Sequence, residues 1–136
     1  MNMIKAEIIT PAGVFYSESV HLVTMPGSRG EFGALAGHVA SLVELQAGLV
    51  TTYDDHMKIL DKIFVSSGFV EVTEEIASIM VEEAKYISDY NLAEVTANLV
   101  SLKSDLKACQ DDSGKEKILK AMQITENLLE ILREGR

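Results

Sequence analysis

The sequence Met-Pro-Gly-Ser-Arg-Gly-Glu-Phe-Gly-Ala-Leu-Ala-Gly-His occupies residues 25–38. One proline and four glycines fall within this short stretch. Glycine serves positions where the backbone needs a positive φ or where another backbone comes close. Because alternating apolar runs lie on both sides, this density predicts a turn, a short strand over residues 31–35 and a second turn.

A phosphate-binding loop is the alternative interpretation of these glycines. A P-loop needs Lys followed by Ser or Thr after its last glycine, and the sequence has no such pair here. The dinucleotide-binding fingerprint needs a helix that opens at the loop, and no helical period follows Gly37. We therefore expect no phosphate site in this stretch.

Alternation of apolar and polar residues predicts strands on both sides of the glycine-rich stretch. Turn residues separate these strands, among them Pro11-Ala12-Gly13 and Asp54-Asp55. Short strands with no helical pattern between them predict an all-β sandwich over residues 1–85. The expected strands cover residues 3–10, 14–25, 31–35, 41–53 with a break near Gly48, 57–65, 69–72 and 76–83.

The period changes from two to helical at about Ala84, with Ser88 or Asp89 as the expected N-cap and Ser113 as the cap of a second helix. Two apolar stripes joined by a polar linker predict an antiparallel two-helix hairpin over residues 86–136. Such a hairpin has little core and must dock on another surface. The stripes comprise Leu92, Val95, Leu99, Leu102 and Leu106, then Ile118, Met122, Thr125, Leu129 and Leu132, widened by Leu128.

Composition excludes several classes of protein. The chain has 136 residues and a net charge of −9, which opposes nucleic-acid binding because phosphate contacts need a basic surface. Its single cysteine, Cys109, rules out an internal disulfide. No apolar run approaches the ~18 residues of a membrane span, and the N-terminus resembles neither a signal peptide nor a presequence. Any work at a membrane would therefore depend on other proteins.

No combination of residues in the sequence predicts catalysis, a cofactor or a metal. The serines lie in expected turns with no general base placed for them, and the histidines show no metal-binding spacing. Adjacent acids within a strand point to opposite faces and do not share a site. These residues are Ser41, Ser66 and Ser67; His21, His38 and His56; and the pairs Asp54-Asp55, Glu74-Glu75 and Glu82-Glu83.

Four motifs in register carry a resemblance to a known family. They occur in the same order and at the same spacing as the matching motifs of the ε subunit of bacterial F-type ATP synthase, which is called δ in mitochondria. The motifs are Ile9 to Val14, Gly27 to His38, Gly48-Leu49-Val50, and Val65 to Val72. The similarity covers essentially the whole chain. Two departures, Ala36 for Pro and Ser67 for Gly, are more typical of the mitochondrial and related bacterial branch.

The resemblance implies a non-catalytic subunit of the central stalk, which couples the γ subunit to the c-ring so that proton flow drives ATP synthesis. It implies γ contacts at Gly37, His38 and Leu42 and c-ring contacts in the glycine-rich loop. For His38, a hydrogen-bonded structural role remains equally open. The implied c-ring contacts are Arg29, Glu31 and Phe32, with Glu31 at the loop tip and Phe32 exposed.

The resemblance also bears on regulation. Some bacterial relatives bind ATP through a motif that matches Ile87 to Ala93 here, but Leu92 replaces its arginine, so we expect no useful ATP affinity. In that family the hairpin can extend towards the catalytic α and β subunits and inhibit hydrolysis, helped by basic residues. Basic residues that could take part in this inhibition are Lys115, Lys117, Lys120, Arg133 and Arg136. The alternative, which is equally open, is that they form a solvated helix face.

Two further expectations concern location and class. A stalk subunit would be peripheral to the cytoplasmic face of the bacterial inner membrane, or to the matrix side in an organelle. The alternative from another class is a free-standing β-sandwich module that binds a small ligand or peptide and dimerises through its hairpin. Gel filtration separates the two, because the stalk subunit should be monomeric alone.

Overall fold

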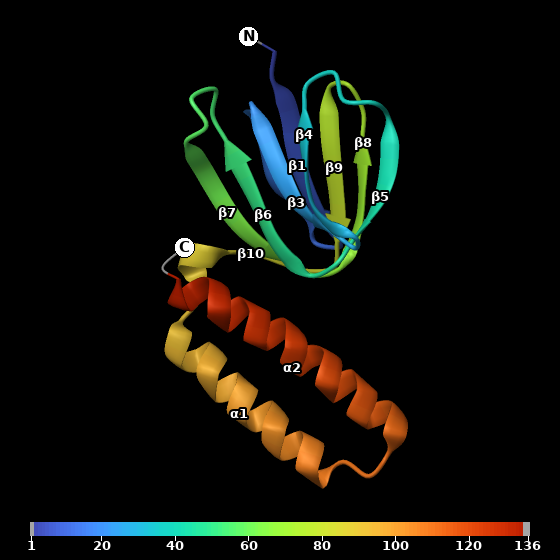
Figure 1. Cartoon of the computed structure of the whole chain (residues 1–136), viewed down its shortest axis with the longest axis vertical. Helices are drawn as coiled ribbons and strands as arrows, with labels where there is room; N and C mark the ends of the chain where they lie inside the picture. Colours follow the sequence, from blue (N-terminus) through green and yellow to red (C-terminus); the bar gives the residue numbers. More distant parts are fainter. Residues whose placement is uncertain (1, 135–136) are drawn as a thin grey trace. The chain divides into compact units, whose positions relative to one another are not determined.

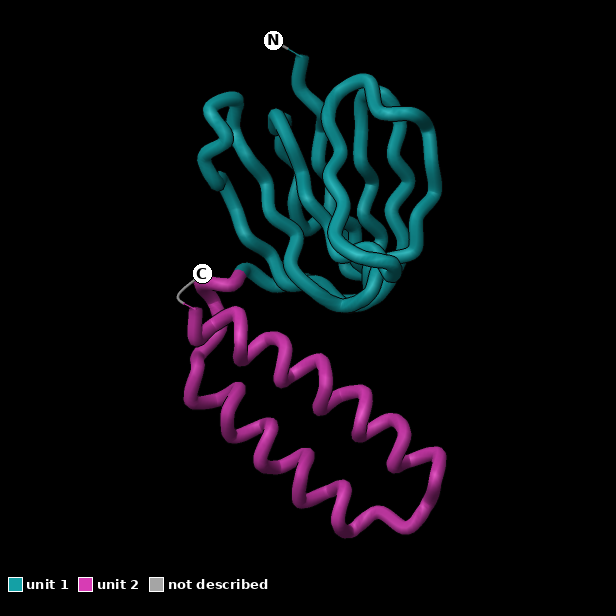
Figure 2. The backbone as a smooth tube through the Cα atoms, viewed as in Figure 1, with its two compact units in different colours: residues 1–86 teal, residues 87–136 magenta. Residues whose placement is uncertain are grey.

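A computed structural model describes residues 2–134. The chain divides into two compact units, residues 1–86 and residues 87–136 (Figure 2). The first unit consists of strands and the second of helices, so the predicted fold class, an all-β sandwich followed by a two-helix hairpin, is confirmed (Figure 1).

Ten strands build the first unit, and most follow the predicted period of two. The structure splits the predicted strand 14–25 into two, interrupts residues 41–53 just before Gly48 as predicted, and adds a short final strand. The strands are β1 Ile4–Thr10, β2 Gly13–Val20, β3 Leu22–Gly27, β4 Gly30–Leu35, β5 Ser41–Leu45, β6 Gly48–Tyr53, β7 Ile59–Val65, β8 Gly68–Val72, β9 Ile76–Val81 and β10 Ala84–Tyr86.

The strand order is β10-β7-β6-β3-β5-β8-β9-β1-β2, with β4 paired to β3. All neighbours are antiparallel except β1 and β9. Between β3 and β5 the pairing shrinks to one position, Gly27 opposite Leu45, so the sheet folds there into two layers. The first layer contains β4, β3, β6, β7 and β10, and the second contains β5, β8, β9, β1 and β2.

The core lies between the layers and is filled by alternate residues of each strand. Its largest fully buried side chains come from both layers, which ties them together. Burial of each aliphatic side chain contributes roughly 1.5–3 kcal/mol relative to exposure. These residues include Ile4, Ile8, Val23, Met25, Leu45, Val50, Ile63, Val70 and Ile79.

The two ends of the strand order, β2 and β10, are joined by side chains. The Tyr16 hydroxyl on β2 donates a hydrogen bond to Asp61 Oδ2 on β7 at 2.7 Å and lies 3.1 Å from Thr52 Oγ1 on β6. The Phe15 and Tyr86 rings meet with centroids 5.2 Å apart. We call this junction the seam.

Replacing Tyr16 by phenylalanine should lower the free energy of unfolding by about 1–3 kcal/mol, because fully buried Thr52 and the Asp61 carboxylate lose their partner. Burial raises the pKa of the Tyr16 phenol above its ordinary value. The folded chain therefore holds a proton that the unfolded chain releases, and wild-type stability should fall as pH rises above about 10.

Urea unfolding at about pH 7 and about pH 11 measures both effects. Tyr53→Phe, which alters a partly exposed tyrosine of the first layer, is the control. If the two variants lost equal free energy of unfolding at neutral pH, the role given to the seam would be contradicted. It would also be contradicted if Tyr16→Phe kept the wild-type loss of stability at high pH.

The second unit contains a 3-10 turn, Ile87–Asp89, and two helices, α1 Leu92–Ala108 and α2 Asp112–Arg133, which lie side by side (Figure 1). The predicted caps are wrong. Asn91 caps α1 by accepting the Ala93 and Glu94 N–H groups, because β10 and the 3-10 turn occupy residues 84–89. Asp111 caps α2 through the Gly114 N–H at 3.0 Å, so Ser113 lies inside the helix.

The residues of the predicted stripes lie on the inner faces of the helices, and they are buried to different extents. Val95, Thr125, Leu128 and Leu129 are buried. Leu92 is the exception at 46% exposed, and it is the first residue of α1. The partly buried members are Leu99, Leu102, Leu106, Ile118, Met122 and Leu132.

Candidate interaction surfaces

The glycine-rich stretch forms a hairpin of β3 and β4 with Ser28 and Arg29 in its turn. Gly27 and Gly30 pair across the turn, and Gly30 has a φ of +130°. Arg29 is therefore at the tip, whereas Glu31 lies inside β4 opposite Pro26. The expectation of Glu31 at the tip is wrong by two residues, although both charged side chains are exposed.

Phe32 does not project as an exposed contact. It is partly buried and packs against the sandwich core, and a Cβ on Gly27 would come within 2.9 Å of its ring. The cause is strand alternation, which directs Phe32 and Ala34 inward and Glu31 and Leu35 outward. The assignment of Phe32 to an exposed interface is thus corrected.

The turn after β4 places Gly37 and His38 beside exposed apolar residues. Gly37 has a φ of +84° and donates its N–H to the Glu74 carbonyl at 2.8 Å. His38 Nδ1 lies 2.7 Å from the Val39 carbonyl oxygen, as in the structural alternative considered for this residue. Val39 is 80% exposed and Leu42 is 69% exposed, so apolar surface lies next to this turn.

An apolar row crosses the outer face of the second layer. Strand pairing aligns Val14 on β2 with Ile9 on β1, then Met80 on β9 and Phe69 on β8. Phe69 is 50% exposed and Val14 is 61% exposed. Together with Leu42 on β5, these residues form the second-layer band.

Sequence reasoning identified only Leu42 of this band. The signal was present for Ile9, Phe69 and Met80, which are apolar and lie next to strand residues that point into the core. Val14 shares the parity of buried Tyr16, and the register shift between β1 and β2 turns it outward. Glu7, Glu44 and Glu71 share this outer face, where Lys5 pairs with Glu7 at 3.7 Å. A groove of about 480 Å³ runs along its edge, lined by apolar residues and acids that include Ile9, Phe69, Met80, Glu44 and Glu82.

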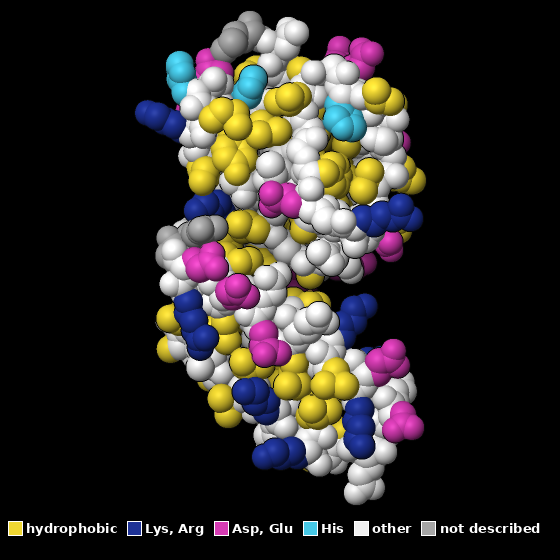
Figure 3. Space-filling model, viewed as in Figure 1, with side chains coloured by type: hydrophobic (Ala, Val, Ile, Leu, Met, Phe, Trp, Pro, Cys, Tyr) yellow, Lys and Arg dark blue, Asp and Glu magenta, His cyan; other side chains and the backbone are white. Residues whose placement is uncertain are grey.

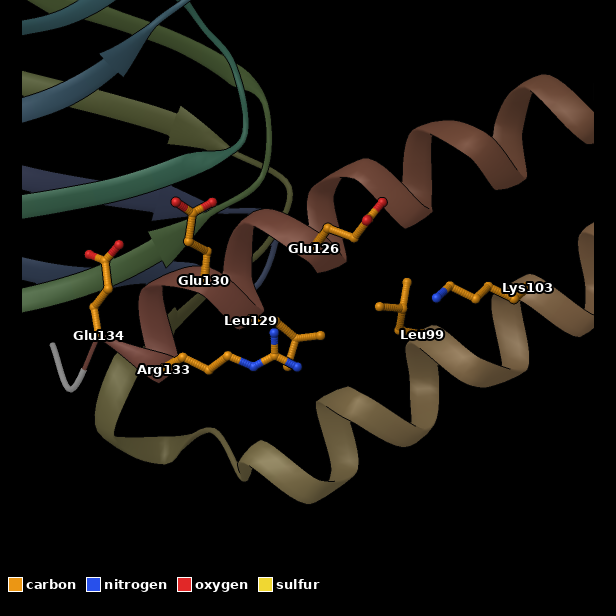
Figure 4. A pocket seen from close by; sticks show the side chains of 7 residues that line it. All are labelled: Leu99, Lys103, Glu126, Leu129, Glu130, Arg133 and Glu134. Atoms are coloured by element: carbon orange, nitrogen blue, oxygen red, sulfur yellow. The ribbon is translucent and has the colours of Figure 1, made fainter.

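The hairpin carries a second groove, of about 590 Å³. Lys and Arg side chains are spread over this unit (Figure 3). Lys103 and Arg133 extend into the space between the helices, beside Leu99 and Leu129 (Figure 4). Three acids also line the groove, namely Glu126 and Glu130 on α2 and Glu134 directly after its end.

Among the polar residues considered for catalysis, Ser66 has a structural role in a turn. The Ser66 hydroxyl accepts the N–H groups of Glu82 and Glu83 at 3.1 and 3.0 Å, which fixes the turn before β8. Within residues 2–134, no three His, Cys, Asp or Glu side chains gather closely enough to hold a metal ion. None of the helices described is long and apolar enough to cross a membrane.

A β-sandwich with an exposed apolar band, followed by a helical hairpin, has the form of an assembly subunit whose surfaces bind other proteins. The family model for the ATP synthase delta/epsilon chain, β-sandwich domain, matches residues 3–87. The chain belongs to the ATP synthase delta/epsilon chain family. This membership confirms the prediction of a non-catalytic ATP synthase subunit, which serves ATP synthesis and ion transport by the complex.

Relatives and solved structures agree with this assignment. The ATP synthase epsilon chain of Rhodospirillum rubrum is 32% identical over 123 residues, 90% of this chain and 91% of that protein. The Rickettsia felis epsilon chain is 38% identical over 104 residues, 76% of this chain and 93% of that protein.

Two mitochondrial ATP synthase structures contain chains with the same fold. The Euglena gracilis structure, described as OSCP/F1/c-ring, has a chain with a TM-score of 0.84 and 22% identity, covering 97% of this chain and 82% of its own. A central stalk/c-ring structure from Tetrahymena thermophila gives a TM-score of 0.66 at 15% identity, covering 94% of this chain and 95% of its own.

Proposed function

We propose that this chain is a rotor subunit of the central stalk that binds the γ subunit through the second-layer band and transmits rotation to the c-ring. The observation that carries the proposal is the band itself, in which apolar side chains align across four strands and Val14, Phe69 and Met80 are exposed. Exposed Leu42 lies on the next strand, β5, two residues from the position that faces Phe69. Contiguous exposed apolar surface of this kind marks a protein interface.

The charges around the band favour a basic partner. Glu7, Glu44 and Glu71 lie on the same outer face as the apolar row, whereas Lys5 is the cation beside them. Complementary charge at the rim fixes register and speeds association. We expect the γ surface that covers this band to combine apolar residues with Lys or Arg.

The β3–β4 hairpin is our candidate for the c-ring contact. Arg29 in its turn and Glu31 on β4 are both exposed and lie two residues apart. A rigid two-stranded tip with charges of both signs suits polar loops of a partner. Phe32 has no part in this contact, because it packs against the core.

Regulation by the hairpin is a further part of the proposal. Lys115, Lys117 and Lys120 are exposed in the first half of α2, and Arg133 is exposed near its end. The fifth candidate, Arg136, lies outside the described residues. The helices α1 and α2 bury few of their side chains. A second docking surface can therefore compete for the hairpin when the free energies of the two docked states differ by only a few kcal/mol. We expect no ATP binding, because Leu92 supplies no charge for a phosphate.

For location, we propose a peripheral position on the cytoplasmic face of the bacterial inner membrane, or the matrix face in an organelle. The complex holds the subunit there through γ and the c-ring.

Binding to F1 tests the proposed function. The wild-type chain is mixed with an α, β and γ complex from the same source that lacks this subunit, and co-elution and ATP hydrolysis are followed. We expect stoichiometric binding. Leu42→Asp with Phe69→Asp should weaken it about 100-fold or more, because charges would be buried at the centre of the interface. Slower hydrolysis on wild-type binding would support inhibition by the hairpin.

Val100→Asp is the matched control, since Val100 is 63% exposed on α1, outside the band. Wild-type affinity in the double variant, with circular dichroism unchanged, would exclude the band as the γ surface. A wild-type chain that does not bind F1 at micromolar concentration would overturn the proposed function.

A further inference from the structure

The apolar row of the second layer ends at an acid. Strand pairing places Glu44 on β5 directly opposite Phe69 on β8, and Phe69 in turn faces Met80 on β9. Burial alternates along β5, so Leu45 lies in the core and Glu44 is exposed on the outer face. The row therefore runs from apolar side chains directly into a carboxylate.

A second acid lies beyond Met80 on the other side of Phe69. Glu82 follows the last residue of β9, is exposed and has the outward parity of Met80. Its backbone N–H donates to the Ser66 hydroxyl at 3.1 Å, which fixes the chain at this point. Glu44 and Glu82 both line the groove of about 480 Å³ at the edge of the second-layer band. We call it the acidic groove.

The wall of the acidic groove between these acids is aromatic and apolar. Phe69 is 50% exposed and Met80 is 41% exposed, and both line the groove. Gly68 also lines it and has no side chain to fill it. A Lys or Arg side chain suits such surroundings, because its hydrocarbon stem packs on apolar surface while its charge interacts with an aromatic ring and carboxylates.

The charges of the second layer favour a cation in this groove. The five strands of the layer contain one basic residue, Lys5, and it already pairs with Glu7 at 3.7 Å. The same strands carry four acids, and a fifth follows β9 directly. These acids are Glu7, Glu18, Glu44, Glu71 and then Glu82.

Arg29 is a basic residue from the first layer that lies close to β5 along the chain. Its neighbour Ser28 donates a backbone N–H to the Glu44 carbonyl at 3.0 Å. Within residues 2–134, however, neither Glu44 nor Glu82 forms an ion pair within 4.0 Å, either with Arg29 or with another cation. Both carboxylates are thus open to a cation that a partner supplies.

We propose that the acidic groove accepts one Lys or Arg side chain of γ, with its stem against Phe69 and Met80 and its charge beside Glu44 and Glu82. This inference rests on the proposed function, which assigns the second-layer band to γ. It adds the kind of side chain that γ supplies and the place where that side chain binds.

Other occupants fit the acidic groove less well. A metal ion needs more ligands than two carboxylates, and no cluster of three His, Cys, Asp or Glu side chains that could hold one exists within residues 2–134. Symmetric pairing of two copies through this groove would bring acids against acids. An apolar side chain would remove water from both carboxylates and give them no partner.

Affinity for F1 tests the groove. The chain is titrated into an α, β and γ complex from the same source that lacks this subunit. Glu44→Gln with Glu82→Gln keeps the side-chain size and removes both charges, so we expect the Kd to rise about tenfold or more. Glu18→Gln is the matched control, because exposed Glu18 on β2 belongs to the same layer and does not line the groove. Its Kd should change about twofold or less.

Crosslinking identifies the side chain of γ. Ser67 is exposed and lines the acidic groove. Ser67→Cys, in a Cys109→Ser background, is labelled with a benzophenone reagent and bound to the same F1 complex. We expect a crosslink to a γ segment that contains Lys or Arg. Replacing that residue by Gln should weaken binding as much as the double acid variant, and combining the changes should add little, because the same contact is lost.

Three results would overturn the inference and leave the γ interface intact. They are a double acid variant that binds like Glu18→Gln, a crosslinked segment without Lys or Arg, and losses that add fully in the combined variant. In each case Leu42→Asp with Phe69→Asp would still weaken binding. A wild-type chain that does not bind F1 would overturn the proposed function and this inference together. Circular dichroism checks that each variant is folded.

Discussion

Replacing Gly68 by alanine is expected to lower the free energy of unfolding by about 3 kcal/mol. The added Cβ would clash with the Met80 carbonyl oxygen, a backbone atom of the neighbouring strand. Gly68 pairs with Val81, so β8 and β9 would have to separate locally to make room. Thermal and urea unfolding followed by circular dichroism give the change in stability.

The same substitution should also affect the second-layer band. Phe69 follows Gly68 directly and pairs with Met80, so displacement of β8 would move two residues of the band. Gly33→Ala is the control, because its Cβ would meet first the Leu22 Cδ1 atom, the end of a flexible side chain, at 3.0 Å. Similar losses of stability in the two variants would show that the contact with Met80 does not control the fold.

Substituting both Leu99 and Leu102 with aspartate is expected to unfold the hairpin and leave the sandwich folded. Both leucines are partly buried on the inner face of α1. Two charges at this contact should cost more than about 4 kcal/mol, which exceeds what a short pair of helices can supply. The helical signal of circular dichroism should fall sharply while the strand signal and the cooperative unfolding of the sandwich remain.

Val100→Asp is again the matched control, because it places the same charge on the exposed side of α1. The helical signal of this variant should stay within a few per cent of wild type, since surface substitutions change stability by about 0.5 kcal/mol or less. Loss of the strand signal in the double variant would mean that the two units unfold together. The proposal that residues 1–85 and 86–136 form separate domains would then be wrong.

Much of the fold could be predicted because its signal is local. A period of two marks a strand whose one face is buried, and a change of period marks the hairpin. Strand β10 escaped prediction because the three residues Ala84–Tyr86 are too few to show alternation. The caps escaped because Ser88, Asp89 and Asn91 all suit an N-cap, and only the path of the preceding chain selects Asn91.

The interaction surfaces were harder to predict, because they depend on pairing between distant strands. Val14 and Phe69 are far apart in sequence, and only the register of β2, β1, β9 and β8 brings them into one row. Phe32 was misassigned because flanking charges suggested exposure, whereas strand parity directs it inward.

The seam gives the sandwich a direction of mechanical weakness. Seven paired positions join β1 to β2, whereas the Tyr16 hydrogen bonds and the Phe15–Tyr86 contact span the gap from β2 to the opposite end of the sheet. A subunit that transmits torque is loaded from different sides as it turns. A shearing load along the seam would be resisted by a few side chains, so the domain should be most compliant there and stiffest across its backbone-paired strands.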